Sequence, residues 1–424
     1  MPFQELHSLL IILTIAAVAP LLCEWVPRIR LPLVVLEIGL GILVGPQVLG
    51  WATTGPTIDE LSRFGLAALF FLAGFEIDFP KIRGWPITLA LLGWFSSLIV
   101  CLGVGFALQR CGMVDSGLIV GAALTTTALG TLIPILRDAN ELSTRFGAYA
   151  VATGAVGEFA PIILIALVLS TGEGEHGGTL VLMLLFTTIT IIGAVVALNY
   201  RPPKLIVTLQ QKMNTSAQLP VRLAILVLAS LVILARNLGL DSILGAIAAG
   251  VLVSLASPGE HGKALERKLD GIGFGFLVPI FFVTTGLHFD LQTLITSKQA
   301  LLQLPIFLAL FFVVRGVPAL LFAHRELDLR SRFALGFLSA TELPLVIAIA
   351  SIGVKSGRLM PETAASLVGA GMASVLLFPI TALSLRRPTA LRREVGPEVT
   401  KSAEFTERRP MTSSARSPSL PGAP

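Results

Sequence analysis

The chain has 424 residues, of which 54% are hydrophobic and 13% are charged, and its mean hydropathy is +0.84. A soluble protein carries about 25% charged residues, so this composition indicates a membrane protein. The net charge of +5 does not indicate nucleic-acid binding, because the basic residues lie between apolar segments and in the C-terminal tail, where they orient helices in a bilayer.

The N-terminus does not resemble a cleaved signal peptide, because the residues before the first apolar run include Glu5 and contain no Lys or Arg. We therefore expect a retained first helix. The three cysteines, Cys23, Cys101 and Cys111, lack metal-ligand spacing, so we expect no structural disulfide, no metal site and no cofactor. The chain has no Walker A loop and no metal-spaced His/Cys set, so we do not expect an enzyme.

A segment needs about 20 apolar residues to span the bilayer, and the sequence has thirteen candidates. They lie near 8–25, 31–51, 61–79, 86–108, 115–137, 143–170, 179–200, 221–236, 239–257, 269–289, 299–323, 331–353 and 363–385. The sequence thus predicts an all-α membrane protein with about 13 transmembrane helices.

The loop charges predict the orientation of these helices. With the N-terminus outside, 16 Lys and Arg residues fall in inside loops and 6 in outside loops, which favours an inside C-terminus and an odd number of spans. We expect a multi-pass protein of the plasma membrane, a bacterial inner membrane. The Pro-, Ser- and Arg-rich tail, 386–424, predicts a disordered cytosolic segment after a transmembrane domain of 1–385.

Three pairs of segments resemble one another at an offset of about 210 residues. "LPLVVLEIGLGILVG" (31–45) resembles 240–254, "FFLAGFEIDF" (70–79) resembles 280–291, and 121–136 lies opposite 336–351. Seven spans separate the partners, so the second copy is inserted upside down. This predicts an inverted-topology repeat, typical of secondary transporters, with halves near 8–170 and 221–385 and a linker helix near 179–200. A chance likeness between Gly-rich apolar helices is the alternative.

Both members of the third pair carry helix-breaking residues. The fifth span contains Thr125, Thr126, Thr127 and Gly130 before Pro134, and the twelfth contains Thr341 and Glu342 before Pro344. Because Thr hydroxyls and Pro can leave backbone carbonyls free inside a bilayer, matching breaks predict a midplane ion site. Ordinary proline kinks are the alternative.

The membrane interior holds few charged side chains, and these are candidates for function because each costs at least about 2.5 kcal/mol to insert. Glu158 lies in "GAVGEFAPII", beside Gly154 and Gly157. A carboxylate away from water can hold either a proton or a bare cation, and this competition suffices for exchange; a packing role is the alternative. Arg315 keeps its charge, and Glu342 is its expected partner or a neutralising charge for broken-helix ends, with a structural role as open as a direct one.

Three further acids and a histidine at helix ends have two interpretations. Glu76 and Asp78 close the third span, and His288 and Asp290 lie at the corresponding end in the second repeat. They are either solvated helix ends or a cation-attracting funnel. Glu37 lies near a membrane interface.

These motifs resemble the monovalent cation:proton antiporter family, in particular its Kef-type and NapA-like branch, over about 10–385. The matching segments are "LPLVVLEIGLGILVGPQVLG", "LAALFFLAGFEIDFPKIR", "TTTALGTLIPILRD" and "VPIFFVTTGLHFDL". The resemblance implies a sodium/proton-antiporter-like fold with two crossed broken helices, a dimerisation domain, a core domain, elevator-type alternating access and a homodimer. We do not expect the cytosolic nucleotide-binding domain of Kef-type potassium systems.

The resemblance also assigns roles to residues. Glu158 matches the family's essential acid as Glu instead of Asp, and Gly157 stands where the family has Asn or Gln. Arg315 matches its basic residue and Glu342 its twelfth-helix acid. We therefore expect H⁺ and a monovalent cation, Na⁺ or K⁺, at Glu158, Thr126, Thr127 and Gly157. One acid with an arginine suggests one-for-one, electroneutral exchange.

Two other functions stay open at this point. The first is a proton-coupled antiporter of an organic ion or toxic metabolite, for which Gly157 leaves room. The second is a channel or a membrane sensor, against which Glu158 argues, because a channel needs no titratable carboxylate at the midplane.

Overall fold

The computed structural model describes most of the chain up to Arg386. It covers 3–25, 32–76, 84–170, 217–238, 242–257, 259–323, 326–386 and nine single residues between 182 and 240. Every regular element in these ranges is a helix. The predicted tail beyond Arg386 and most of the predicted linker helix 179–200 lie outside the described residues.

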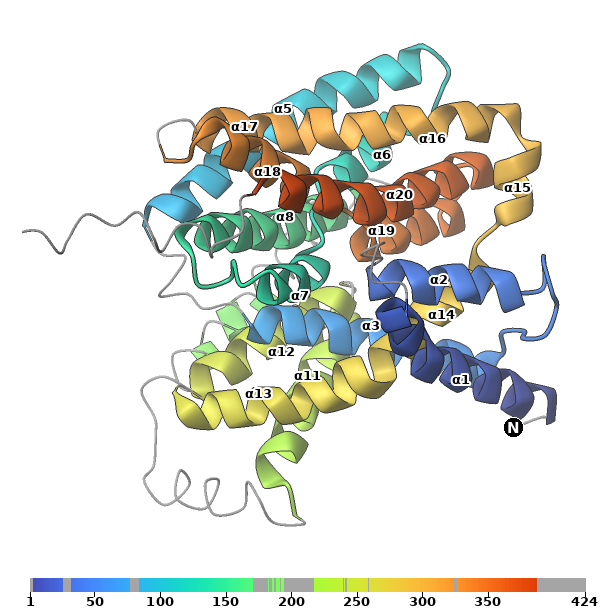
Figure 1. The fold of residues 1–424 in the computed structure, drawn as a ribbon, viewed down its shortest axis with the longest axis vertical. Helices are drawn as coiled ribbons and strands as arrows, with labels where there is room; N and C mark the ends of the chain where they lie inside the picture. Colours follow the sequence, from blue (N-terminus) through green and yellow to red (C-terminus); the bar gives the residue numbers. More distant parts are fainter. Residues whose placement is uncertain are drawn as a thin grey trace, which may run out of the picture. The chain divides into compact units, whose positions relative to one another are not determined.

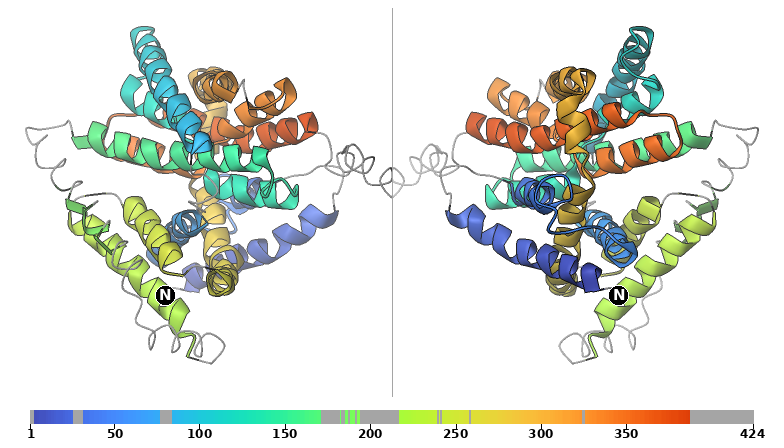
Figure 2. Two further views of the ribbon diagram at one scale, coloured as in Figure 1. Left: turned by 90° about the vertical axis from the view of Figure 1, so that its left-hand side faces the viewer. Right: turned by 90° about the vertical axis from the view of Figure 1, so that its right-hand side faces the viewer.

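The helices form two groups, which all views separate (Figures 1 and 2). We call the first group the scaffold bundle: α1 (Phe3–Trp25), α2 (Leu33–Val44), α3 (Pro56–Phe75), α11 (Leu219–Asn237), α12 (Ser242–Ala256), α13 (Glu260–Ile272), the π-helical turn η1 (Gly273–Leu277) and α14 (Val278–His288).

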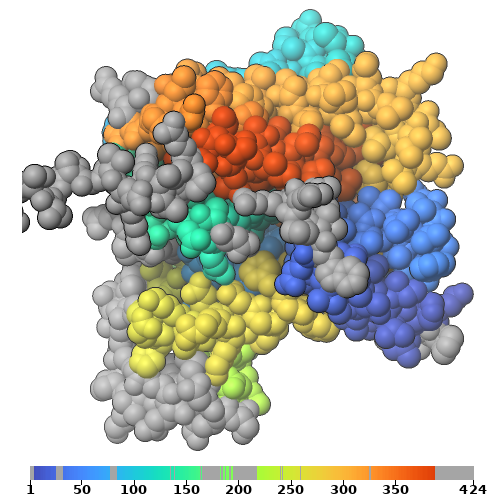
Figure 3. All heavy atoms as spheres, viewed as in Figure 1, coloured from blue at the N-terminus to red at the C-terminus, as the bar shows by residue number. Residues whose placement is uncertain are grey.

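We call the second group the core bundle, and α15 connects it to the scaffold. Its elements are α5 (Trp85–Arg110), α6 (Gly117–Leu124), α7 (Leu129–Asp138), α8 (Arg145–Ser170), α15 (Leu291–Thr296), α16 (Lys298–Phe311), the π-helical turn η2 (Phe312–Gly316), α17 (Val317–Phe322), α18 (Leu329–Ser339), α19 (Pro344–Lys355) and α20 (Pro361–Leu385). Figure 3 shows α20 at the surface of this bundle, next to α16.

Twelve of the thirteen predicted spans overlap a helix of the described residues, and seven helices there are long and apolar enough to cross a membrane by themselves. Two boundaries differ most from the prediction. The helix α2 has only 12 residues and ends before Gly45. The tenth span was expected from 269, but the helix runs from Glu260 to His288 through η1, because its first turns are amphipathic and hydropathy alone does not detect them.

The scaffold helices pack as the predicted repeat requires. The helices α2 and α3 are the second and third spans of the first repeat. Their counterparts in the second repeat are α12 and α14, respectively. A Cβ on Gly286 of α14 would overlap the Ile38 carbonyl of α2. In the equivalent pair, a Cβ on Gly250 of α12 would overlap the Phe71 carbonyl of α3. Each copy thus places its second helix against the third helix of the other copy, with glycine where the backbones touch.

The core helices repeat a second packing pattern. The helices α5 and α6 meet at Gly105 and Gly117, and a Cβ on either would overlap the carbonyl of the other. Their counterparts, η2 and α18, meet at Gly316 and Gly336, where a Cβ on Gly316 would lie 2.8 Å from the Gly336 oxygen. The repeat boundaries remain a prediction, which this equivalence supports.

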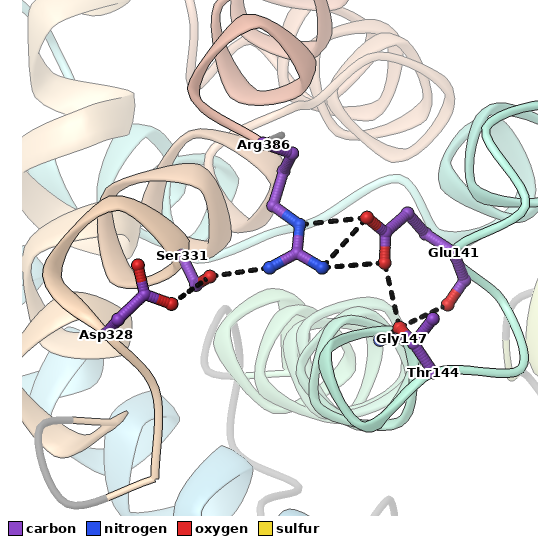
Figure 4. A network of polar contacts seen from close by, with 6 residues as sticks. All are labelled: Glu141, Thr144, Gly147, Asp328, Ser331 and Arg386. Atoms are coloured by element: carbon purple, nitrogen blue, oxygen red, sulfur yellow. Dashed lines mark hydrogen bonds and ion pairs between the residues drawn. The ribbon is translucent and has the colours of Figure 1, made fainter. Parts of the chain in front are cut away.

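A network of polar contacts joins one end of the core bundle (Figure 4). The guanidinium of Arg386, directly after α20, donates to both carboxylate oxygens of Glu141, at 2.8 Å for each Nη2 contact, and Nη1 lies 2.5 Å from Ser331 Oγ of α18. The side chains of Arg386 and Glu141 are only 12% and 4% exposed. Ser331 donates to Asp328 at 2.6 Å, and this hydrogen bond lowers the pKa of Asp328. The network fixes the ends of α7, α8, α18 and α20 to one another.

Candidate ion-binding site

The first predicted break lies between α6 and α7. The hydroxyls of Thr125 and Thr126 donate to the carbonyls three residues earlier, Ala122 and Ala123, at 2.8 and 2.9 Å. The N–H groups of Thr125 and Thr126 donate to the same two carbonyls at 3.1 and 3.3 Å, so the last turn of α6 tightens and the helix ends. The helix resumes at Leu129, so the break involves the threonines, whereas Pro134 falls inside α7.

The second break, 340–343, separates α18 from α19. Pro344 is the first residue of α19, a position where its missing N–H costs nothing. The backbone N–H of Glu342 donates to Ser374 Oγ of α20 at 2.9 Å, and Ser374 also donates to the Gly371 carbonyl at 2.7 Å. Polar groups of the break are therefore satisfied from a neighbouring helix, as they must be inside a membrane.

The two breaks contact each other directly. The N–H of Ala128 donates to the carbonyl of Thr341 at 2.8 Å, and Thr127 Oγ1 donates to the carbonyl of Ser339 at 2.6 Å. The N–H of Thr127 donates to the carbonyl of Gly157 in α8 at 2.9 Å. These bonds bring the polar backbone of both broken helices and α8 to one place in the core bundle.

Glu158 lies at this place. It is 2% exposed, and its Oε2 accepts a hydrogen bond from the N–H of Leu129, the first residue of α7, at 2.9 Å. The N–H of Gly130 is a second donor to the carboxylate. Unpaired N–H groups and the helix dipole make a helix N-terminus favourable for negative charge. The break thus provides a site where a buried carboxylate is stabilised without a cationic side chain.

Arg315, on η2, is fully buried. Its Nε donates to Thr127 Oγ1 at 2.8 Å, and its Nη2 donates to the carbonyl of Thr153 at 2.6 Å. A Cβ on Gly157 would overlap both Arg315 Nη2 and Thr127 Oγ1. The room that we expected at Gly157 for an ion or an organic substrate is therefore occupied by the guanidinium.

Glu342 is also fully buried, and one of its carboxylate oxygens, Oε2, is in hydrogen-bond contact with Thr126 Oγ1. Its other oxygen has no protein partner among the described residues. Arg315 attracts it electrostatically, but the two side chains form no ion pair within 4.0 Å in this part of the chain. The expected partnership is indirect, and it runs through the adjacent residues Thr126 and Thr127.

The structure therefore brings all six predicted site residues together around the two breaks: Glu158, Gly157, Thr126, Thr127, Arg315 and Glu342. Sequence reasoning missed Ser374 and Thr153, which supply a hydroxyl and a carbonyl to the site. Ser374 lies in the small-residue run "GAGMASV", so a search for single polar residues in apolar spans would have found it.

The predicted helix-end residues have separate surroundings. The carboxylates of Glu76, Glu266 and Asp270 approach within 4.8 Å of one another, a spacing that could hold a cation. Arg137 of α7 lies 3.1 Å from Glu76 and thus already supplies a positive charge there. Asp78 lies outside the described residues.

At the corresponding end in the second repeat, Asp290 caps α15 by accepting from the N–H of Thr293 at 2.9 Å. His288 Nε2 lies 3.5 Å from Asp59. The cap formed by Asp290 and the contact between His288 and Asp59 are both compatible with the interpretation of these residues as solvated helix ends. Glu37 is 2% exposed in α2, and its position near a membrane interface stays a prediction.

Comparisons with known proteins agree with this geometry. Residues 13–384 match the family model described as "Sodium/hydrogen exchanger, transmembrane". The chain is 30% identical to the putative Na⁺/H⁺ antiporter YjbQ of Bacillus subtilis over 97% of this chain and 67% of that protein. It is 24% identical to the Na⁺/H⁺-K⁺ antiporter GerN of Bacillus cereus over 83% of this chain and 89% of that protein.

The fold is similar to that of the sodium proton antiporter MjNhaP1 from Methanocaldococcus jannaschii. The TM-score is 0.60 at 14% identity, over 90% of this chain and 99% of that one. The match to the family model covers most of the chain, including both broken helices and Glu158. The chain therefore belongs to the sodium/hydrogen exchanger family, a family of membrane transporters.

Proposed function

We propose that this protein exchanges a monovalent cation, Na⁺ or K⁺, for H⁺ by alternating access, and that Glu158 binds either one. The observation that carries the proposal is the position of the Glu158 carboxylate, buried and directed at the N-terminus of α7 beside the break. A titratable group held between two broken helices can meet an ion from either side when those helices move.

The helix terminus explains how one carboxylate serves both ligands. The N–H groups of Leu129 and Gly130 stabilise the ionised form while the site exchanges ligands. A proton or a cation then neutralises the carboxylate, and a neutral site costs less to move through the membrane than a charged one. The empty, charged site is consequently the form that resists movement, and this property couples the two fluxes.

We assign Arg315 a bracing role in the same mechanism. Its donors hold Thr127 and the Thr153 carbonyl, so they connect η2 to the first break and to α8. Glu342 supplies a negative charge within range of Arg315. In this mechanism only Glu158 changes its ligand, whereas Arg315 and Glu342 keep their charges. One proton is then exchanged for one monovalent cation, so the exchange is electroneutral.

Assembly and orientation are part of the proposal. We infer a homodimer through the scaffold bundle. The helices α1 and α11 are apolar over a length that could cross a membrane, yet only 22% of the residues in the apolar segment of each are buried within the chain. The core bundle would move against this fixed scaffold. The loop charges favour an outside N-terminus and an inside C-terminus in a bacterial plasma membrane.

Exchange of an organic ion is the second candidate function. One argument for it was the free space expected at Gly157, and the structure does not have that space. The space at Gly157 that would admit a larger substrate holds the Arg315 guanidinium and Thr127 Oγ1. The names of the two relatives given above specify Na⁺ and, for GerN, also K⁺, so alkali cations are the first ligands to test.

The test uses the purified chain in liposomes that hold a pH-sensitive dye and an imposed proton gradient. Addition of Na⁺, K⁺, Li⁺ or Rb⁺ is expected to move protons in the wild type and not in Glu158→Gln, because Gln cannot exchange a proton. Glu37→Gln is the matched control, since Glu37 is equally buried but lies in the scaffold bundle. Full activity of Glu158→Gln would refute the site, and no response of the wild type to any alkali cation would refute the function.

A further inference from the structure

Arg137, near the end of α7, connects the core bundle to the scaffold bundle. Its Nη2 lies 3.1 Å from Oε1 of Glu76, the residue that ends α3, and 3.9 Å from Oε1 of Glu266 in α13. Figure 1 shows α7 at the boundary between the two bundles, beside α3. Among the described residues, every other ion pair lies within one bundle. The two contacts of Arg137 therefore join the bundle that we expect to move to the bundle that we expect to stay fixed.

The scaffold side of this contact has an excess of negative charge. Glu76, Glu266 and Asp270 have carboxylate oxygens within 4.8 Å of one another, and Asp270 Oδ1 is buried with no hydrogen-bond partner among the described residues. The side chain of Glu76 is only 5% exposed. Like charges at this spacing repel one another, most strongly where water is excluded. A position of the core bundle that brings Arg137 to these acids is consequently favoured over one that removes it.

The helix that carries Arg137 also contacts the Glu158 carboxylate. The N–H of Gly130, near the start of α7, is a donor to Glu158, and a Cβ on Gly130 would lie 3.2 Å from Leu69 Cδ1 of α3. Arg137 follows Gly130 by two helical turns in α7. Glu76 follows Leu69 by two turns in α3. The helices α7 and α3 thus lie side by side from the Glu158 site to the end of α7.

We propose that Arg137 acts as a latch, in which its ion pairs with Glu76 and Glu266 hold α7 against α3 and close the route to Glu158 from this end. The inference rests on the proposed function, because a latch has a role only if the core bundle moves. A shift of α7 along α3 by one helical turn, about 5.4 Å, would break ion pairs whose reach is about 4 Å. In the orientation proposed above, this end faces the cytosol, so an open latch exposes Glu158 to that side.

Thiol labelling measures the opening of this interface directly and needs no transport. Ala73 is 2% exposed and lies between Leu69 and Glu76 on the same face of α3, at helical spacing from both. A thiol at this position reacts when α7 moves away from α3. The full chain carries Ala73→Cys, with the three native cysteines replaced by alanine, and is treated with a polar maleimide in a non-ionic detergent.

The labelling rate reports the population of the open state when opening and closing are faster than labelling. Arg137→Gln is expected to raise the rate at Ala73→Cys about fivefold, the low end of typical coupling between two conformational states. Arg137→Lys keeps the positive charge and should keep most of the slow labelling. Glu76→Gln should also raise the rate, and its combination with Arg137→Gln should give less than the product of the two effects, because both remove the same ion pair.

Two controls separate the latch from a general loss of structure. Arg145→Gln is the matched variant, because Arg145 is also exposed and ion-paired, but its partner Glu326 lies between α17 and α18 of the core bundle; it should leave the labelling rate unchanged. Ala155→Cys places a thiol inside the core bundle, where Ala155 is 3% exposed. This position should stay unlabelled in Arg137→Gln, since the latch opens the interface and not the core.

Three results would overturn the latch: equal labelling of the Ala73→Cys chain with and without Arg137→Gln, an equal acceleration by Arg145→Gln, or labelling of Ala155→Cys that rises in parallel. Each of them is independent of transport. A chain that exchanges no alkali cation in liposomes would refute the proposed function, whereas the labelling rates alone decide whether Arg137 holds the two bundles together.

Discussion

Replacing Gly157 by alanine tests the arrangement around Arg315. The added Cβ would overlap Arg315 Nη2 and Thr127 Oγ1 and lie 2.7 Å from Thr127 Cβ. Neither neighbour can retreat freely, because Thr127 is bonded to Ser339 and the guanidinium is bonded to Thr153. Overpacking costs about 1–3 kcal/mol, and loss of one hydrogen bond to a charged group costs about 1.5–3 kcal/mol. If both costs apply in full, we expect the free energy of unfolding to fall by about 2.5–6 kcal/mol.

The matched control is Gly154→Ala, one helical turn earlier in α8. Its Cβ would lie 2.9 Å from Leu129 Cδ1 and 3.5 Å from Leu132 Cδ1, and both atoms are ends of flexible side chains. A cost of about 1 kcal/mol or less is expected there, within the range for tolerated core changes. The two variants are compared by thermal unfolding in detergent and by exchange in liposomes. Equal stability and equal exchange of the two would show that no guanidinium occupies the space beside Gly157.

Four further outcomes follow from the structure. If one proton and one cation compete for Glu158, the apparent KM for the cation rises as pH falls, by at most about tenfold per pH unit; a pH-independent KM measured in liposomes would contradict a shared site. One-for-one exchange predicts that an imposed membrane potential leaves the exchange rate unchanged, and acceleration by the potential would refute this stoichiometry. Arg386→Met leaves Glu141 as a buried unpaired charge, so unfolding free energy should fall by about 3–5 kcal/mol, and the double variant with Glu141→Leu should recover part of it. The pKa of Asp328 is lowered in the folded state, so its contribution is complete above its ordinary pKa of about 4 and is lost as pH falls further; the difference in unfolding temperature between wild type and Asp328→Asn should shrink only below about pH 4.

The broken helices could be predicted because their causes are partly local. Consecutive threonines compete with the helix backbone for hydrogen bonds, and Pro344 has to start a helix rather than continue one. The position of the first break was less predictable, because the fifth span contains both a run of threonines and Pro134. It is determined by bonds from Thr127 to Gly157 and from Ala128 to Thr341, between residues far apart in the sequence.

The partners of Arg315 show a second limit of sequence reasoning. Charge complementarity suggested Glu342, because opposite charges in a membrane are expected to pair. The guanidinium instead donates to a threonine hydroxyl and a backbone carbonyl. This solution depends on the glycine at position 157, whose missing side chain is informative only when the neighbouring helix is known to approach it.

The local geometry of η2 explains why an arginine can be held there at all. Arg315 lies in a π-helical turn, a wider turn that is frequent at functional sites. Directly after it, Gly316 lets η2 approach α18 at Gly336, which brings the guanidinium within reach of Thr127. The same approach keeps Arg315 on the α8 side of the break, whereas the Glu158 carboxylate faces the N-terminus of α7. In the proposed mechanism, separate anchors for the permanent charge and the titratable acid would leave Glu158 free to exchange its ligand while the framework around it stays fixed.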